Sequence, residues 1–353
     1  MAPGFSLPRK EFENANGTFT AEVDLYRRMI QEFGHLFFFA SNPNRTIRLG
    51  QSEEKELTSR IDEVFTFERT LSLATRPAGE DRNATVWYNK MTLEEFTSKT
   101  GGNLLNYTVY LNELATLFKL PYRFHRTDKV VVRDVGYYEK LSRILLKTPP
   151  LTLHNFLGKK LAYGWVGATD SHMREFAFRH ASLKTGVRQM TPLWKDCLGT
   201  VGGWAASRLY VDHFVLPGTK EKATEVVDDL KAVFTEVVLK RDVDWLDEPT
   251  RKRALEKAAK THYYVAYPDW LLNDTALDAE VYHFTDKDYV QVERGQYFSA
   301  VVEATRRAIG VHFAELHRKP DVKRDFLAPP SAVNAFAAHA KNAIGKLGRG
   351  EGV

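Results

Sequence analysis

A helical repeat runs through KEKATEVVDDLKAVFTEVVLKRD, residues 220–242, and it limits the folds open to this chain. Apolar residues recur there at steps of three and four, so they form one stripe along a helix with charged residues opposite. Pro217 and Gly218 punctuate its start, and Lys240 and Arg241 suit the negative end of a helix dipole. We therefore expect a long amphipathic helix whose stripe consists of Ala223, Val226, Val227, Leu230, Val233, Phe234, Val237 and Val238.

The same reasoning predicts a mainly α-helical protein. Directly after this stretch, Asp247 can cap a helix and Pro249 fits its first turn, where a missing N–H costs nothing. The best strand candidate is DKVVVRDV at 128–135. With 353 residues, 43% of them hydrophobic, the chain can bury a sizeable core in one large domain or two. Further helices are expected over residues 22–33, 53–74, 136–146, 152–163, 173–183 and 289–316.

Charge is spread along the whole chain. Fifty basic and forty-five acidic residues leave a net charge of +5, with both signs present throughout. Tracking of phosphates needs basic residues gathered on one face, so we expect no nucleic-acid partner. The densest apolar stretch, FGHLFFFA at 33–40, is far short of a membrane span, and the N-terminal MAPGFSLPRKEF holds no apolar targeting core. We therefore expect no membrane segment and no targeting signal in this chain.

Cysteine and asparagine residues point to different compartments. Cys197 is the only cysteine, so no disulfide can close within the chain, which indicates a reducing compartment or a missing partner. Five Asn-x-Thr sequons, against about one or two expected by chance, favour a secreted glycoprotein. Unused sequons also accumulate, so both interpretations stay open at this point. The candidate glycosylation sites are Asn16, Asn44, Asn83, Asn106 and Asn273.

No catalytic constellation is visible from chemistry alone. A zinc peptidase helix needs two His four residues apart with a Glu between them, and no pair among the eleven histidines satisfies this. His312 and His317 come closest, but a five-residue step separates the rings by about 140° around a helix. Cys197 beside Asp196 is better explained as a small, half-buried helical cysteine than as a reactive thiol. GTVGG at 199–203 lacks the spacing of a phosphate loop and is expected to allow close helix approach.

Five separated phrases resemble the neprilysin and endothelin-converting-enzyme family of zinc endopeptidases. Each phrase is weak alone, but the five occur in the family's order across residues 80–344. The opening GFSLPRKEFEN also resembles a family segment that contains a Leu-Pro-x-x-(Asp/Glu)-Tyr phrase. The five phrases are EDRNATVWYNKMTLEEF (80–96), PLWKDCLGTVGGWAASRLYVDHFV (192–215), VDWLDEPTRKRALEKAAK (243–260), YPDWLLNDTALD (267–278) and SAVNAFAAHAKNAI (331–344).

The resemblance implies a mainly helical, glycosylated ectodomain that is anchored at the plasma membrane (type II) or secreted. It divides the chain into a roofing domain with connecting segments at 1–325, the first substrate-binding strand of a thermolysin-like catalytic domain at 326–344, and a disordered tail outside the family pattern at 345–353. The family's roofing domain covers a cavity that admits short peptides, and it packs on the catalytic domain. Short peptides and that catalytic domain are therefore the implied partners.

The binding site implied by the resemblance is small. Residues 333–336, Val-Asn-Ala-Phe, match a family phrase whose Asn and Ala bind the substrate backbone by strand addition. Asn334 and Ala335 are therefore the expected substrate-binding residues. No metal ligand or catalytic residue is expected in this chain, because the family holds zinc with a His-Glu-x-x-His helix and a downstream Glu that follow the phrase resembled by residues 342–344.

Three departures from the family pattern accompany the resemblance. Ala337 stands where the family has Tyr after Asn-Ala-Phe, which weakens the match of the substrate strand. The family's cytoplasmic tail, membrane anchor and cysteine-rich start have no counterpart in this sequence. Cys197 corresponds to a family cysteine that pairs with one upstream, so the resemblance places its disulfide partner outside the chain and reconciles it with the sequons.

The sequence supports two functional hypotheses. The first is a fragment of a neprilysin-like zinc metalloendopeptidase that hydrolyses small extracellular peptides, with the zinc-binding half absent from this chain, so that the chain alone is expected to be inactive. The alternative is a non-catalytic relative that acts as a peptide-binding module or decoy. Against the alternative, half of a composite cavity would expose apolar surface that normally packs on the catalytic domain.

Overall fold

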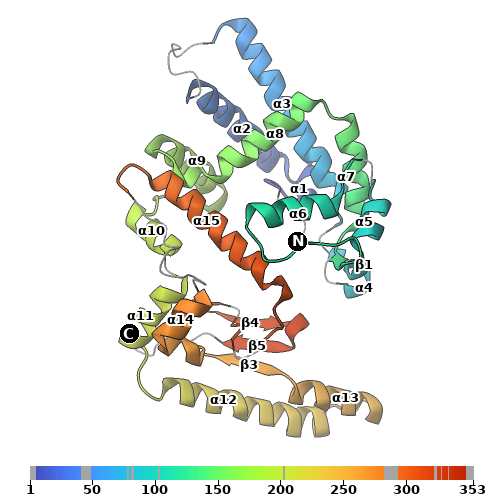
Figure 1. Ribbon diagram of the computed structural model, residues 1–353, viewed down its shortest axis with the longest axis vertical. Helices are drawn as coiled ribbons and strands as arrows, with labels where there is room; N and C mark the ends of the chain where they lie inside the picture. Colours follow the sequence, from blue (N-terminus) through green and yellow to red (C-terminus); the bar gives the residue numbers. More distant parts are fainter. Residues whose placement is uncertain are drawn as a thin grey trace. The chain divides into compact units, whose positions relative to one another are not determined.

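Two compact units make up the chain in the computed structural model, and each is described by itself (Figure 1). Unit 1 comprises residues 1–190 and 292–314, and unit 2 comprises residues 191–291 and 315–353. Both units are mainly helical, which confirms the predicted fold class. The structure describes residues 5–40, 49–77, 79–80, 83–101, 104–201, 203–281, 293–321, 324–326, 328–332 and 334–346.

Unit 1 is a helical body with a two-stranded sheet. Strand β1 (Asn89–Thr92) pairs antiparallel with β2 (Lys129–Val132). The strand expected over 128–135 is therefore confirmed as β2. The helices of unit 1 are α1 (Arg9–Glu13), α2 (Thr20–Ala40), α3 (Gln51–Ala74), α4 (Ala84–Trp87), α5 (Leu93–Lys99), α6 (Tyr107–Leu117), α7 (Val135–Lys147), α8 (Pro150–Gly164), α9 (Ser171–Thr185) and α15 (Tyr297–Ala314).

Side-chain caps explain where several of these helices begin. Asp134 accepts the N–H of Tyr137 at the start of α7, and Asp170 caps α9 in the same way. Thr92 and Glu95 form a reciprocal capping box at the start of α5. Each cap satisfies an N–H group that has no partner within its own helix.

The largest core of unit 1 brings α1, α2 and α9 together. Phe12 of α1 and Phe176 of α9 are fully buried. The ring centre of Phe176 lies 5.8 Å from that of Phe33 in α2. The buried residues of this core are Leu7, Phe12, Val23, Tyr26, Met29, Ile30, Phe33, Ile61, Val166 and Phe176.

A charged cluster is also buried in unit 1. Glu68 of α3 is fully buried, and Lys159 Nζ of α8 lies 2.7 Å from its Oε2 atom. The Tyr26 hydroxyl donates to the same carboxylate, and the N–H and hydroxyl of Ser6 donate to its Oε1 atom at 3.0 and 2.9 Å. Burial alone would raise the pKa of Glu68, but Lys159 and these hydrogen bonds lower it to about 2. This Glu68 cluster joins α2, α3, α8 and the segment that precedes α1.

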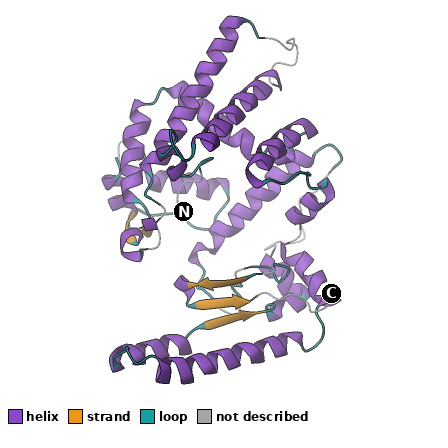
Figure 2. Ribbon diagram, turned by 180° about the vertical axis from the view of Figure 1, so that it is seen from behind, coloured by secondary structure: helices purple, strands orange, loops and turns teal. Residues whose placement is uncertain are grey.

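Unit 2 contains a three-stranded sheet in the order β3-β5-β4 (Figure 2). Strand β3 (His262–Val265) runs parallel to β5 (Ala343–Lys346), and β4 (Ala335–Ala338) runs antiparallel to β5. Helix α12 lies next to β3, where the Lys231 ammonium group is 5.3 Å from the ring centre of Tyr263. The helices of unit 2 are α10 (Leu193–Val201), α11 (Gly203–Phe214), α12 (Thr219–Val233), α13 (Glu248–Ala259) and α14 (Asp274–Val281).

The helix expected over 220–242 is present but changes form along its length. It is α-helical in α12 and continues as the π-helical segment η3 (Phe234–Asp242). All residues of α12 are at least partly exposed, and Val226, Leu230 and Val233 of the predicted stripe have more than half of their surface exposed. The repeat therefore predicted the helix correctly, but this part of the stripe is not a core face of unit 2.

The other expected helices correspond to observed ones with shifted ends. Helices α2, α3, α7, α8, α9 and α13 occupy the predicted regions. The helix expected over 289–316 contains α15, which begins at Tyr297, and residues 289–292 of that prediction lie outside the described residues.

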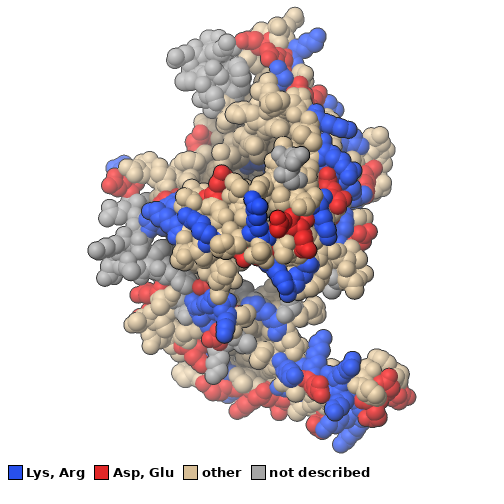
Figure 3. All heavy atoms as spheres, turned by 45° about the vertical axis from the view of Figure 1, so that its right-hand side comes forward, with Lys and Arg blue, Asp and Glu red and all other residues tan. Residues whose placement is uncertain are grey.

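Charges of both signs are interspersed on the face drawn in Figure 3, where Lys and Arg side chains lie among Asp and Glu side chains. Several charged side chains of the described residues form ion pairs, such as Arg27 with Asp62 at 2.8 Å and Lys240 with Glu236 at 2.7 Å. Exposed pairs of this kind contribute little to stability. The mixed pattern is that of an ordinary solvated surface.

Candidate functional site

Strand β4 lies at an edge of the unit 2 sheet and begins at the residues expected to bind substrate. Among the residues that the structure describes, β4 pairs with β5 on one side only. Asn334, which precedes β4, and Ala335, its first residue, are both exposed. An edge strand presents N–H and C=O groups to which another extended segment can pair. The position of β4 therefore suits strand addition.

The first amide of β4 has a local partner. The N–H of Ala335 donates to Oδ1 of Asn334 at 2.8 Å. A peptide carbonyl that used this N–H would replace the local bond. Binding at this point therefore exchanges one hydrogen bond for another, and its net gain is smaller than that of a new bond to a free group.

Side chains alternate between two environments along β4. Ala335 and Ala337 are exposed, whereas Phe336 and Ala338 are half-buried. Successive side chains of a strand point to opposite faces, so Ala337 shares a face with Ala335. The neprilysin-like pattern has Tyr at the position of Ala337, and that side chain would lie on this exposed face. In this chain, β4 presents only the methyl groups of Ala335 and Ala337 there.

Phe336 lies over Gly345 of β5. The two residues are directly opposite in the strand register, and a Cβ atom on Gly345 would overlap the Phe336 ring. The ring covers the backbone that glycine leaves bare, a pairing that stabilises glycine in sheets. Strand β5 therefore continues through Gly345 and Lys346, which the expected boundary at 344 had placed in a disordered tail. Residues 347–353 of that tail lie outside the described residues.

Asn342 fixes the turn between β4 and β5. It adopts the left-handed conformation, with φ of 46°, which Asn tolerates better than most residues. Its side-chain amide donates to the Lys257 carbonyl at 3.1 Å, and its own carbonyl accepts the N–H of His262 at 3.0 Å. Asn342 thus joins the turn to α13 and to β3. Sequence reasoning missed this role, although Asn is one of the residue types that favour turns and tolerate the left-handed conformation.

We expect Asn342→Ala to lower the free energy of unfolding of unit 2 by about 2 kcal/mol, because it removes the side-chain hydrogen bonds with Lys257 and Thr261 and strains a left-handed residue. Asn342→Gly is the matched control: it loses the same hydrogen bonds without the strain, so about 1 kcal/mol is expected. Urea unfolding of the two variants measures the difference. Equal stability of both variants and wild type would contradict the anchoring role.

The sheet is supported by an aromatic contact. Tyr264 of β3 is 2% exposed, and its ring centre lies 4.9 Å from that of Phe326. Burial raises the pKa of Tyr264, and the carboxylates of Asp325 and Asp321 act in the same direction. The phenol therefore stays protonated and neutral across the physiological pH range.

The described residues do not form a metal site. Among them, no group of three or more His, Cys, Asp or Glu side chains could hold an ion. His312 lies in α15 and His317 in the short turn Glu315–His317. The residues described here therefore do not fit the zinc that the resembled family uses.

Helix positions and backbone conformation account for Cys197 and for the glycine-rich stretch beside it. Cys197 lies in α10 and is half-buried, which confirms the expected setting, while its pairing with an outside cysteine stays a prediction. Gly203 has φ of 39° at the start of α11, and the space where a Cβ would stand is open. The expectation of close helix approach was therefore wrong at Gly203, where the positive φ accounts for glycine.

Four of the five candidate glycosylation sites lie in the described residues, and all four asparagines are exposed. Asn106 and Asn273 use their side-chain oxygens to cap the starts of α6 and α14. Asn83 accepts hydrogen bonds from Thr85, and Asn16 lies in the turn between α1 and α2. Asn44 lies outside the described residues. Glycan attachment at any of the five stays a prediction.

Comparison with known proteins identifies relatives over most of the chain. A family model described as Peptidase family M13 matches residues 1–268. The chain is 27% identical to Neprilysin-1 from Trittame loki over 306 residues, which cover 86% of this chain and 40% of that protein. It is 25% identical to neprilysin from Mus musculus over 359 residues, which cover 97% of this chain and 44% of that protein. It is 26% identical to endothelin-converting enzyme 1 from Homo sapiens over 300 residues, which cover 84% of this chain and 37% of that protein. The chain thus spans less than half the length of these relatives.

Solved structures share the fold. The crystal structure of Mycobacterium tuberculosis zinc metalloprotease ZMP1 with an inhibitor matches with a TM-score of 0.76 and 17% identity, covering 97% of this chain and 47% of that one. PepO from Lactobacillus rhamnosis matches with a TM-score of 0.74 and 16% identity, and the match covers 98% of this chain and 50% of that one. The sequence matches correspond to the N-terminal portion of neprilysin-like proteins. The chain belongs to peptidase family M13. In the part of the chain that the structure describes, no helix has the length and apolar content to cross a bilayer.

Proposed function

We propose that this chain is part of a zinc metalloendopeptidase that hydrolyses short extracellular peptides, and that β4 binds the peptide backbone as an added strand. Asn334 would contribute its side-chain amide, and Ala335 would contribute its main-chain groups. The observation that carries the proposal is an exposed strand edge at these two residues in a chain of peptidase family M13. The relatives named neprilysin and endothelin-converting enzyme support a peptide substrate.

We assign the zinc and its ligands to sequence outside this chain, because the family's His-Glu-x-x-His motif does not occur in residues 1–353. In this assignment, residues 1–325 form the roofing domain and residues 326–344 form the first substrate-binding strand. The parent protein would be a glycosylated ectodomain, either anchored at the plasma membrane or secreted. Cys197 would then pair with a cysteine that this chain lacks.

Long-read sequencing of the transcript on both sides of codons 1–353 tests whether the chain is partial. We expect the reading frame to continue into codons for a His-Glu-x-x-His helix. An abundant transcript that stops after Val353, together with a product that binds peptides without cleaving them, would replace the proposal with a non-catalytic peptide-binding relative.

In the parent peptidase, Asn334→Ala is expected to lower kcat/KM by about 10–100-fold, because it removes a hydrogen bond to the substrate backbone worth about 1.4–2.8 kcal/mol in the transition state. The exposed Asn334 side chain bonds only to its neighbour Ala335 among the described residues, so folding should be unaffected. Steady-state hydrolysis of a peptide with an internal apolar residue, beside a thermal melt, measures both effects.

His339→Ala is the matched control for this variant. His339 is an exposed residue of the turn that follows β4, and it is not assigned a contact with substrate. We expect its kcat/KM to equal that of wild type. Unchanged turnover of Asn334→Ala, or an equal loss in both variants, would refute the assigned role of Asn334.

A further inference from the structure

Unit 1 contains a cavity of about 1190 Å³ that follows strand β2. Its walls come from the chain around α1, the end of α3, α6 and the start of α7. Residues 130–134 line it consecutively, whereas none of its lining residues belongs to β1. The cavity therefore lies along the side of β2 that faces away from β1.

The hydrogen-bond pattern leaves this side of β2 open. The N–H of Leu93 donates to the carbonyl of Asp128 at 3.0 Å, one residue before β2 begins. Because hydrogen-bonded pairs alternate along an antiparallel ladder, Val130 bonds to β1 and its two neighbours point the other way. Lys129 and Val131 therefore direct their N–H and C=O groups to the open edge, and these groups have no hydrogen-bond partner among the described residues.

Exposed apolar side chains surround this edge. Leu104, Val109, Tyr110 and Val131 line the cavity and are 42%, 52%, 57% and 43% exposed. A strand laid along β2 would remove these surfaces from water. It would also complete a sheet of three strands, whereas a two-stranded sheet is only marginally stable by itself.

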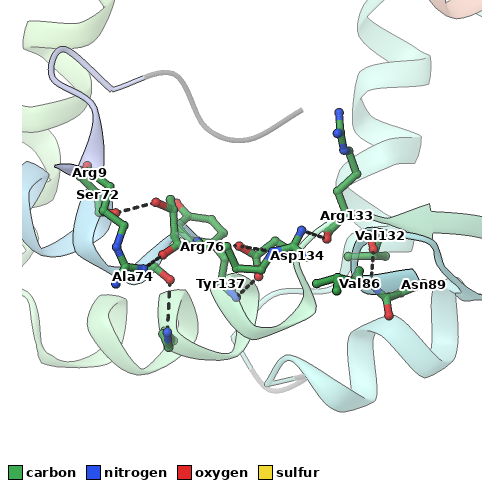
Figure 4. A network of polar contacts seen from close by, with 12 residues as sticks. Arg9, Ser72, Ala74, Arg76, Val86, Asn89, Val132, Arg133, Asp134 and Tyr137 are labelled. Atoms are coloured by element: carbon green, nitrogen blue, oxygen red, sulfur yellow. Dashed lines mark hydrogen bonds and ion pairs between the residues drawn. The ribbon is translucent and has the colours of Figure 1, made fainter. Parts of the chain in front are cut away.

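A network of polar contacts closes one end of the edge. The Arg76 guanidinium group donates to the carbonyl of Arg133, directly after β2, and it is 3.5 Å from the carboxylate of Asp134 (Figure 4). Asp134 also accepts the N–H of Tyr137 at 2.9 Å. This network holds the end of β2 against α3 and α7, so the edge that a partner would meet is fixed in place.

Positive charge lies at the same end. In Figure 4 the Arg133 side chain extends away from the network, and its guanidinium group stands 5.0 Å from the ring centre of Trp87. Arg76 is paired with the carboxylate of Asp134. The contact of Arg133 is with the Trp87 ring, which is neutral and supplies no negative charge to the guanidinium group. An acidic side chain at the end of an added strand would complement Arg133.

We infer that the open edge of β2 accepts an extended segment of a partner polypeptide as a third strand. The segment pairs with Lys129 and Val131, places alternate apolar side chains against Val109 and Tyr110, and carries an acidic residue near Arg133. All of these residues belong to unit 1, so the inference does not depend on β4 or on peptidase activity. Two main-chain donors and two acceptors that find no partner within the described part of unit 1 lie beside apolar walls, and these features select an extended peptide over a helix or a small apolar molecule.

Binding of one defined probe tests the inference. The probe is a fluorescein-labelled, N-acetylated octapeptide, Asp-Val-Thr-Val-Thr-Val-Thr-Asp, in which the terminal acids serve either strand direction. We expect saturable binding to the full chain by fluorescence anisotropy. Two further probes carry N-methyl groups on alternate residues, one probe for each set. Methylation of the residues whose N–H groups face β2 should weaken binding at least tenfold, and methylation of the other set should weaken it less than threefold. The reason is that only one set of N–H groups faces a neighbouring strand.

Two variants of Val131 connect this signal to β2. Val131→Pro removes the outward N–H without touching the bonds to β1, as edge strands allow, and should weaken binding at least tenfold. Val131→Thr keeps the N–H and the branched shape and should bind within threefold of wild type. Equal binding of the two N-methylated probes, equal binding of the Pro and Thr variants, or a chain that binds no probe and elutes as a dimer would overturn the inference.

Discussion

Glu68→Gln is expected to lower the free energy of unfolding of unit 1 by about 3–5 kcal/mol. The carboxylate is fully buried and pairs with Lys159, whose side chain is only 9% exposed. Without the negative charge, the Lys159 ammonium group stays buried and has no carboxylate to compensate for its lost hydration. Hydrogen exchange of the α3 and α8 amides measures the loss within unit 1.

Two further variants separate charge from packing in the Glu68 cluster. The double change Glu68→Leu with Lys159→Met removes both buried charges, but it leaves the Tyr26 hydroxyl and the Ser6 N–H without their acceptor. It is therefore expected to restore only part of the lost stability. Lys160→Met is the matched single control, because Lys160 Nζ lies 3.7 Å from the same carboxylate but its side chain is 36% exposed, so the expected cost is about 1 kcal/mol or less. A Glu68→Gln protein as stable as wild type would show that the cluster does not hold unit 1 together.

The same carboxylate predicts how stability depends on pH. The pKa of Glu68 is lowered from its ordinary 4.5 to about 2. Between these two pH values the folded state keeps the carboxylate charged, whereas the unfolded chain binds a proton. The contribution of Glu68 to the free energy of unfolding is therefore fully present above pH about 4.5 and is lost as the pH falls toward 2. The stability gap between wild type and Glu68→Gln should shrink by about 3 kcal/mol between pH 7 and pH 2. A gap independent of pH would contradict this.

Phe176→Ala is expected to cost about 3–5 kcal/mol, the range for removing a fully buried aromatic ring. Phe176 is 0% exposed, and its ring centre lies 5.8 Å from that of Phe33 and 4.8 Å from that of His180. The rings around it belong to α2 and α9, so the space left by the substitution cannot close without moving a helix. Urea unfolding followed by far-ultraviolet circular dichroism gives the difference.

Phe37→Ala provides the comparison, because the Phe37 ring contacts Phe33 from an exposed position. Phe37 also stacks on Phe33, at 6.1 Å between ring centres, but it is 49% exposed. Its substitution removes the contact with Phe33 from an exposed position and leaves no enclosed cavity, so about 1 kcal/mol is expected. Similar costs for the two substitutions would mean that burial of Phe176 is not what stabilises the contact between α2 and α9.

The helices could be predicted because their signals are local. The apolar period of residues 53–74 and the cap at Asp247 lie within short stretches of sequence, and α3 and α13 appear where these signals place them. Periodicity does not tell whether a stripe is covered. Helix α12 carries its predicted stripe, yet Leu230 is 66% exposed, because burial depends on what packs against a helix and not on the helix itself.

The strands of unit 2 were harder to predict, because each has only four residues and β3 gains its hydrogen bonds from a partner that is distant in the sequence. His262 pairs with Ala343, and no local pattern records that contact. Asn334 and Ala335 were predicted to bind substrate because residues 333–336 resemble a family phrase. Only the structure places them at a sheet edge. Asn342 was missed as an anchor because its role depends on a bond to Lys257.

The central position of β5 also sets an order of events during synthesis. Strand β3 leaves the ribosome well before β5, and the register pairs His262 with Ala343. At about 5–20 residues per second, the interval between the two strands lasts roughly 4–16 seconds. Through that interval Tyr264, which is buried in the finished sheet, has no strand to pair beside it, and it is open to chaperones and to wrong partners. The edge at β4, where we propose that peptides bind, therefore forms only after the ribosome has passed residue 346.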